Sequence, residues 1–302
     1  MTKSLEAGDS TIDGAVIHSP ARGDSGTETL EPGTRRNAIA APVRVPPLTA
    51  EAVTVGYGGS PVLAGLGIHF RPSEVTALVG PNGSGKSTLL AALCHLLTPS
   101  AGAVLLDGAS IARMPTKARA RQLALVAQGT EKPDALDVRT LVSYGRYPHR
   151  GAFGTGDPFG DQAIAEAITL CRLDDVADRP VDALSGGQRQ RVWLACALAQ
   201  QTPWLLADEP TTYLDLGHQT EVLRLLRRLH TEQGRGLVMV LHDLSQAAQY
   251  ADRIVVLDNG RVVADGTPAE VITDDLLMEV YRVEARVIPH PANGLPTVVP
   301  LP

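Results

Sequence analysis

Short runs of apolar residues, separated by turn residues, dominate the chain from Leu48 onward. Such runs, bounded by glycine, proline and polar clusters, are typical of strands. We expect strands at 52–55, 62–70, 75–79, 104–106 and 123–127, and again at 204–207, 237–241, 254–257 and 262–264. Helical spacing occurs between them at 87–97 and 216–231. This alternation predicts an α/β core.

Between residues 129 and 201 the strand pattern gives way to helical periodicity, with helices expected at 139–144, 161–171 and 188–199. Because strand patterns return at residue 204, we interpret 129–201 as a helical subdomain inserted into the α/β core. The resulting domain spans 48–273, and residues 274–302 form a C-terminal appendage. No internal repeat of fixed period is found.

Residues 1–47 are rich in glycine, serine, threonine, proline and charge, with few large apolar side chains. We interpret them as a disordered N-terminal extension. A secretory signal would require an apolar segment that this region lacks, and the early acids Glu6, Asp9 and Asp13 disfavour an organelle-targeting peptide. The arginine pair Arg35–Arg36 lacks the apolar stretch of a twin-arginine signal.

Composition narrows the classes of protein further. The chain of 302 residues has 44% hydrophobic residues, and none of its apolar runs approaches the roughly 20 residues of a membrane-spanning helix. Its net charge of −6 argues against a non-specific nucleic-acid binder, so we expect no nucleic-acid partner. The 3 cysteines show no metal or disulfide spacing, and we expect reduced, structural thiols.

A glycine-rich segment directly follows the strand at 75–79 and opens a helix, in the form GxxxxGK[ST]. Its backbone N–H groups are suited to cradle phosphates, Lys86 to neutralise the β and γ charges, and Ser87 to ligate Mg²⁺. We therefore expect nucleotide binding with Mg²⁺ by these residues: Gly80, Pro81, Asn82, Gly83, Ser84, Gly85, Lys86, Ser87 and Thr88.

Two adjacent carboxylates, Asp208 and Glu209, end the apolar run at 204–207. Beside a phosphate-binding loop, Asp208 is expected to hold Mg²⁺, and Glu209 to polarise the water that attacks the γ-phosphate. The alternative is a solvated strand end.

Gln128 and His242 also follow apolar strands, at the strand ends where α/β folds bind ligands. Gln128 is a candidate for contact with Mg²⁺ and the attacking water, and His242 for a hydrogen bond to the γ-phosphate. A single glutamine or histidine at such a position is also common as a structural polar group.

The segment LSGGQRQR at 184–191 is a second anion-binding element. Ser185, Gly186, Gly187 and Gln188 precede a helical pattern, and the N-terminus of a helix favours phosphate through its free N–H groups and its dipole. One nucleotide site in one chain does not require two such elements.

Taken in order, these motifs resemble the nucleotide-binding subunit of an ATP-binding cassette (ABC) transporter. The resemblance extends from about Leu48 to Thr273 and includes GPNGSGKST, Gln128, LSGGQRQR, LLADEP, TTYLD and His242. It implies a P-loop NTPase of the ABC type, with a RecA-like core sheet, an antiparallel β subdomain and an inserted helical subdomain. It also implies ATP hydrolysis coupled to transport.

The resemblance further implies that two subunits pair head to tail, each ATP lying between one phosphate loop and the other subunit's signature. Ser185, Gly186 and Gly187 would then complete the electrostatic shell of the phosphate only in trans. In this family Tyr57 matches the aromatic that stacks on adenine, and Asp215 matches a residue facing the partner beside ATP. A buried tyrosine at a strand end is the alternative for Tyr57.

Subfamily features resemble importers of ferric siderophores and their haem and cobalamin relatives. These are the segments YGRYPHRG at 144–151, TTYLDLGHQ at 211–219 and the ending from Val287 onward. They imply two permease subunits, indirectly a substrate-binding protein, and a peripheral location at the cytoplasmic face of the membrane. Open alternatives are a haem or cobalamin importer and a non-transport ABC ATPase, although the usual second cassette or coiled-coil insertion is absent here.

Overall fold

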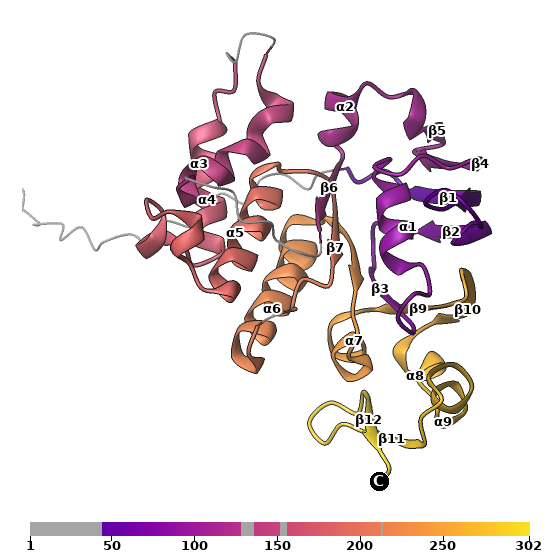
Figure 1. Cartoon of the computed structure of the whole chain (residues 1–302). Helices are drawn as coiled ribbons and strands as arrows, with labels where there is room; N and C mark the ends of the chain where they lie inside the picture. Colours follow the sequence, from indigo (N-terminus) through magenta and orange to yellow (C-terminus); the bar gives the residue numbers. More distant parts are fainter. Residues whose placement is uncertain (1–43, 128–135, 152–155, 213) are drawn as a thin grey trace, which may run out of the picture. The chain divides into compact units, whose positions relative to one another are not determined.

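The computed structural model describes residues 44–127, 136–151, 156–212 and 214–302. Most of the expected N-terminal extension therefore lies outside the described residues, as does Gln128. Within these ranges the chain forms three sheets and the helices that cover them (Figure 1). Among the described helices, none combines the length and apolar character needed to span a bilayer.

The largest described sheet has six strands, in which β10 is antiparallel to its neighbour and the other strands pair in parallel. Parallel pairing needs crossover connections, which the helices provide. The strands, in spatial order, are β10 (Arg261–Gly266), β9 (Arg253–Asp258), β3 (Val75–Val79), β8 (Gly236–Val240), β7 (Trp204–Asp208) and β6 (Leu123–Val126).

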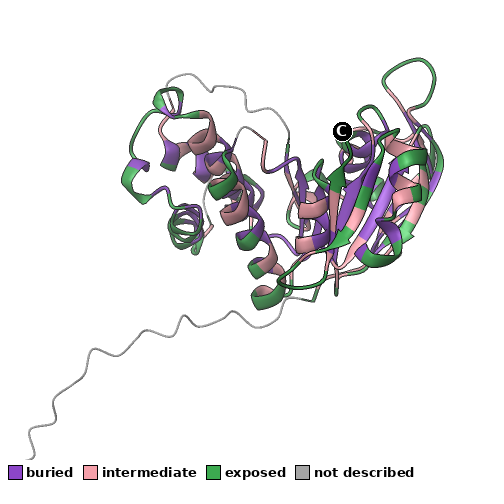
Figure 2. Ribbon diagram, turned by 90° about the horizontal axis from the view of Figure 1, so that it is seen from below, coloured by how far each residue is buried: buried purple, intermediate pink, exposed green. Residues whose placement is uncertain are grey.

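Both faces of this sheet are covered over its parallel strands, which explains why these strands are mostly apolar, whereas the edge strand β10 alternates between exposed and partly buried residues. Along β3, Ala77 and Val79 belong to one buried cluster, whereas Leu78 belongs to another on the opposite face. This follows from the two-residue period of a strand. Figure 2 shows the resulting band of buried strands with partly exposed helices beside it.

The second sheet is antiparallel and packs, together with helix α1 (Lys86–Leu93), into the cluster that contains Leu78. Phe70 and Leu63 are fully buried there. Its strands, in spatial order, are β2 (Leu63–Phe70), β1 (Leu48–Val55), β4 (Ala101–Leu106) and β5 (Ala109–Ser110).

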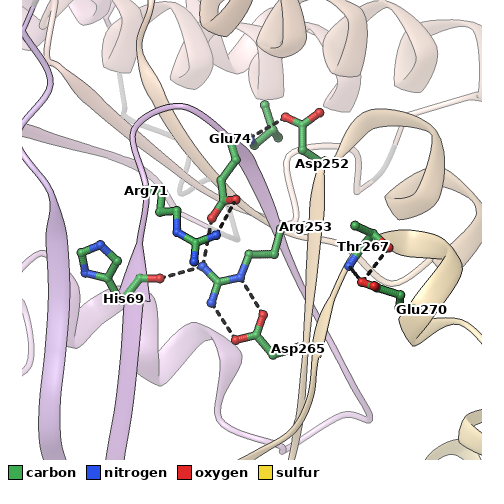
Figure 3. A network of polar contacts seen from close by, with 9 residues as sticks. His69, Arg71, Glu74, Asp252, Arg253, Asp265, Thr267 and Glu270 are labelled. Atoms are coloured by element: carbon green, nitrogen blue, oxygen red, sulfur yellow. Dashed lines mark hydrogen bonds and ion pairs between the residues drawn. The ribbon is translucent and has the colours of Figure 1, made fainter.

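Arg253 at the start of β9 ties the two sheets together (Figure 3). Its guanidinium donates to both Asp265 oxygens at 2.6 Å, and also to the Glu74 carboxylate at 3.0 Å and the His69 carbonyl at 2.7 Å. His69 lies on β2 and Asp265 on β10, so one planar fork bridges the two sheets. The bonds to Asp265, together with those to Glu74, raise the pKa of Arg253.

Most of the remaining helices contribute buried residues to the cluster on the other face of the large sheet, and α3, α4 and α5 pack on one another, whereas α2 contributes none. No strand occurs in the described part of residues 129–201. The helices are α2 (Thr116–Ala120), α3 (Val138–Ser143), α4 (Gly160–Leu170), α5 (Gly186–Ala199), α6 (Leu216–Gln233), α7 (Leu244–Tyr250), α8 (Pro268–Val271) and α9 (Asp274–Leu276).

A buried ion pair holds the C-terminal end of α5. Arg146 is 3% exposed and donates from Nε and Nη2 to the two Asp157 oxygens, both at 2.8 Å. Its Nη1 donates to the Ala199 carbonyl at 2.8 Å, which is in the last turn of α5. The hydrogen bonds from Arg146 hold the pKa of Asp157 below its usual value.

The first helix is shorter than expected, since α1 ends at Leu93 rather than at residue 97. His95 adopts a left-handed conformation with φ of 56°, and the N–H groups of Leu96 and Leu97 both bond to the Ala91 carbonyl. These bonds close the helix end in place of another turn, as left-handed caps do. The apolar spacing up to Leu97 therefore reflects packing beyond the helix.

The chain after residue 273 is structured and packs on the core. It comprises α9, a π-helical turn (Leu277–Tyr281) and a hairpin of β11 (Ala285–Pro289) and β12 (Pro296–Pro300). Leu277 and Ala285 are buried in the main core cluster. The hairpin is fastened to α7, because Val298 N–H donates to Ser245 Oγ at 3.1 Å. The domain boundaries at 47 and 273, and the subdomain limits at 129 and 201, stay predictions.

Candidate functional site

The loop between β3 and α1 requires glycine at particular points. Gly80 has φ of 141°, and a Cβ there would collide with the Leu257 carbonyl oxygen. Gly85 has φ of 102°, and a Cβ there would lie 2.5 Å from the Leu63 side chain. Only glycine combines these conformations with such close approach. The sequence thus folds locally into a tight turn whose backbone can come close to a ligand.

The Lys86 side chain bends back over this loop. Its Nζ donates to the carbonyls of Gly80 at 2.9 Å and Pro81 at 2.8 Å, and it lies 3.4 Å from Ser84 Oγ. Burial lowers the pKa of Lys86, while Glu209 and Asp208 act in the opposite direction. An anionic partner stabilises a buried cation that is held by neutral carbonyls more than it stabilises an exposed cation.

Ser87 and Asp208 meet where the loop faces the end of β7. Ser87 Oγ donates to Asp208 Oδ1 at 3.1 Å, and Asp208 is only 7% exposed. Burial raises the pKa of Asp208. These hard oxygen donors fit Mg²⁺, which often uses one or two protein ligands and completes its shell with water and phosphate. Accordingly, no group of three histidine, cysteine or acidic side chains in the described chain forms a metal site by itself.

Glu209 lies between His242 and Thr212. His242 Nε2 is 2.5 Å from Glu209 Oε1, and Thr212 Oγ1 donates to Oε2 at 3.1 Å. Glu209 is largely buried and has φ of 49°, a left-handed conformation that costs an L-residue about 1–2 kcal/mol. The structure therefore holds this carboxylate in a strained and specific orientation. Thr212 was not anticipated as a site residue, although it lies three positions after Glu209.

A cavity of about 700 Å³ opens between the loop and the ends of the core strands. Its volume is in the range of small-molecule sites. Val62 is the one lining residue that the sequence did not indicate, because a single valine beside a strand carries no chemical signal. The lining residues are Val62, Asn82, Gly83, Gly85, Lys86, Ser87, Thr88, Glu209 and His242.

The signature residues lie elsewhere. Ser185 caps α5, accepting from Gln188 N–H at 3.2 Å while Gln188 Oε1 accepts from Ser185 N–H at 3.0 Å. Ser185 is exposed, and none of the residues 185–188 lines the cavity.

Asp215 and Tyr57 are also outside the cavity lining. Asp215 caps α6 by accepting from His218 N–H at 2.9 Å, and its side chain is 69% exposed. Tyr57 is 69% exposed, so it is not the buried tyrosine that was the alternative. The structure brings together the loop, Asp208, Glu209 and His242, whereas Tyr57, Ser185 and Asp215 are exposed and lie outside the cavity lining.

Comparison with known proteins identifies the family and the fold. The ABC transporter family model matches residues 63–212. The chain is 45% identical over 249 residues to the iron(3+)-hydroxamate import ATP-binding protein FhuC of Bacillus subtilis (strain 168), covering 82% of this chain and 93% of that one. It is 46% identical over 253 residues to the hemin import ATP-binding protein HmuV of Rhodococcus jostii (strain RHA1), covering 84% and 86%.

Solved structures share the fold. A putative metal-chelate type ABC transporter in an inward-facing conformation matches with a TM-score of 0.73 at 26% identity, covering 85% of this chain and 98% of that one. The dimeric cassette MJ0796 in a post-hydrolysis state with ADP and Pi matches with a TM-score of 0.67 at 29% identity, covering 73% and 98%. The cassette fold expected from the motifs is confirmed. The chain therefore belongs to the ABC transporter family, as one of its ATP-binding, ATP-hydrolysing subunits.

Proposed function

We propose that this chain energises an importer of ferric siderophores, bound through two permease subunits to the cytoplasmic face of the cell membrane. The observation that carries the ATPase part is the convergence of Lys86, Ser87, Asp208, Glu209 and His242 around one cavity. The siderophore part is supported by relatives named for import of iron(3+)-hydroxamate and of ferric enterobactin, the latter 43% identical.

In the proposed reaction Lys86 exchanges its loop carbonyls for the β and γ phosphate oxygens of ATP. Ser87, Asp208 and Gln128 would hold Mg²⁺, which when bound neutralises charge on the phosphate oxygens. Gly80 to Thr88 supply the backbone cradle, and Tyr57 stacks on adenine. An exposed tyrosine ring is compatible with stacking.

Glu209 would accept a proton from the attacking water as general base. In the structure both of its oxygens are engaged, one by His242 and the other by Thr212. His242 must therefore turn from Glu209 toward the γ-phosphate for both residues to perform the roles proposed for them. Because His242 is 48% exposed, this movement needs little repacking.

The second half of each site would come from a second copy of the chain, paired head to tail. Ser185 is the exposed N-cap of a 14-residue helix, and the partly buried Gly186, Gly187 and Gln188 form its first turn, where free N–H groups favour phosphate. Asp215 is exposed at the start of α6 and would face the partner beside ATP. Support for this arrangement is that a single chain leaves these residues away from its own cavity.

Reconstitution of the whole importer tests the proposal. The chain would be co-purified with its permeases and placed in liposomes with ATP inside and a ferric hydroxamate, hemin or cobalamin outside, delivered by the binding protein. We expect ATP-dependent uptake of the ferric siderophore, and none with the Glu209→Gln chain. The hemin-import relative at 46% identity makes hemin the second candidate. Uptake of hemin or cobalamin alone would contradict siderophore import.

A further inference from the structure

A second cavity lies away from the ATP site and is rich in arginine. It has a volume of about 610 Å³ and is walled by the end of α4 together with α5, α6 and α7. Five arginines line it, against the single carboxylate of Glu221. In a chain with net charge −6 such a concentration of cations is not expected by chance. The lining arginines are Arg172, Arg191, Arg224, Arg227 and Arg228.

Two of these arginines already have carboxylate partners. Arg227 makes a fork with Asp252, with both N–O distances 2.7 Å, and Arg172 contacts Glu221 at 2.5 Å. Arg191, Arg224 and Arg228 have no ion pair with a described carboxylate. Arg224 and Arg228 stand one helical turn apart on α6, where like charges destabilise a helix. The fold therefore leaves an excess of positive charge at this cavity.

Buried donors at the cavity also lack acceptors. Arg191 Nε and Gln249 Nε2 are inaccessible to solvent and have no hydrogen-bond partner among the described residues. Gln249 is held in place by Asn293 of the C-terminal hairpin, which donates to its Oε1 at 2.6 Å. Buried polar groups are normally satisfied, so these two donors are unusual, and an acceptor in the cavity would reach them only after their side chains move.

Apolar side chains complete the lining. Leu194, Val222 and Leu225 are buried beneath the arginines, and Tyr250 is partly buried at one side. Guanidinium groups bind phosphate through paired hydrogen bonds, and an apolar floor favours an organic group attached to it. The volume is that of sites for small molecules rather than of a flat protein surface.

We propose that this cavity binds a small organic phosphate, with Arg191, Arg224 and Arg228 on the phosphate and the organic group on Leu194 and Leu225. The walls α5 and α6 begin at the predicted site residues Ser185 and Asp215. A bound phosphate would thus bridge the two helices that begin at the residues proposed to face the ATP of a partner chain.

Calorimetric titration of the full chain tests the site directly. The chain is first saturated with Mg²⁺ and a non-hydrolysable ATP analogue, so that the probes cannot occupy the phosphate loop. The probes are phenyl phosphate, inorganic phosphate and citrate. We expect phenyl phosphate to bind more tightly than inorganic phosphate, because only the former covers the apolar floor, and more tightly than citrate.

The matched variants are Arg224→Gln with Arg228→Gln, and Arg113→Gln with Arg261→Gln as a control of equal charge change. All four arginines are exposed, so neither variant should disturb folding. The first pair should weaken phenyl phosphate at least about tenfold, since hydrogen bonds to a charged group are lost. The control should not. Absence of binding at millimolar phenyl phosphate, equal weakening by both variants, or preference for citrate would overturn the proposal, whatever the chain transports.

Discussion

The loop face and the signature face of the predicted ATP site differ in how far a single chain completes them. At the loop face, Lys86 and Glu209 are buried, and each is positioned by hydrogen bonds or ion contacts around one cavity. At the signature face, Ser185 is exposed and its side chain is used to cap its own helix. The difference teaches that the loop face is organised within one chain, whereas the second phosphate contact that we propose would come from another surface.

The largest effect should come from Glu209→Gln, which keeps the shape of the side chain and removes the base. We expect ATP turnover to fall by about 10²–10⁴-fold, the typical contribution of general base catalysis. Nucleotide should be retained, with accumulation of a nucleotide-bound dimer. Steady-state phosphate release and size-exclusion chromatography measure the two effects. Glu279→Gln, an exposed residue of the appendage, is the control, and undiminished turnover of Glu209→Gln would refute the assigned role.

Lys86→Ala, also at the loop face, should weaken the binding of ATP. Removing the ammonium leaves the γ-phosphate without its cation, and we expect the affinity for ATP to fall by about 10–100-fold. Titration with a fluorescent ATP analogue measures this loss. Lys117→Ala removes a lysine outside the cavity and should bind normally. Equal ATP affinities of the Lys86→Ala and Lys117→Ala chains would contradict the role of Lys86 in binding the phosphates.

Asp157→Asn should destabilise the fold around the signature helix α5 without changing nucleotide binding. It removes the carboxylate that faces buried Arg146, and we expect the free energy of unfolding at pH 7 to fall by about 1–2 kcal/mol. Because the pKa of Asp157 is lowered in the folded state, the stabilisation is complete above the unfolded pKa of about 3.9. It is lost as pH falls through the folded pKa.

Urea denaturation between pH 7 and pH 3 checks this prediction. The difference in the free energy of unfolding between the wild-type and Asp157→Asn chains should shrink below about pH 4. The ATP affinity of the loop face should not change. A difference that stays constant over the whole pH range would show that the carboxylate charge contributes nothing.

The smallest expected effect tests most directly whether the loop face of one chain works with the signature face of another. Ser185→Arg and Lys86→Ala chains, each inactive alone, should regain activity when mixed, because one of the two sites in a mixed dimer is intact. Random pairing predicts about one quarter of the wild-type sites, since half of the dimers are mixed. ATPase assays on dimers verified by mass spectrometry measure the recovery. No activity in verified mixed dimers would contradict sharing of the site between chains.

Sequence patterns predicted the core of the fold well because its signals are local. Val75–Val79 is buried throughout and apolar except for Thr76, as expected of a strand covered on both faces, and the glycines after it are demanded by close approach. By contrast, α7 was not expected. It has only 7 residues and follows directly on His242, so its periodicity is too short to recognise.

The site could be predicted only where its residues have reactive or charged side chains within recognisable motifs. Lys86 opens α1 after the glycine-rich loop, Asp208 and His242 stand at strand ends, and the structure brings the three to one place. Val62 and Thr212 could not be found, since their contribution depends on how distant segments pack. The roles assigned to Ser185 and Asp215 come from a resemblance, because one chain holds no geometry that would reveal contacts made between two chains.

The left-handed backbone at Glu209 links the thermal stability of this protein to its ATP turnover. An L-residue in that conformation makes the native state less stable than it would be with glycine, and asparagine is also better tolerated there. Replacements that relax the backbone would relieve this strain, but they would also remove the proposed base and its contacts with His242 and Thr212. The strain at this position is thus tied to the proposed chemistry, and thermal robustness is more readily gained elsewhere in the chain.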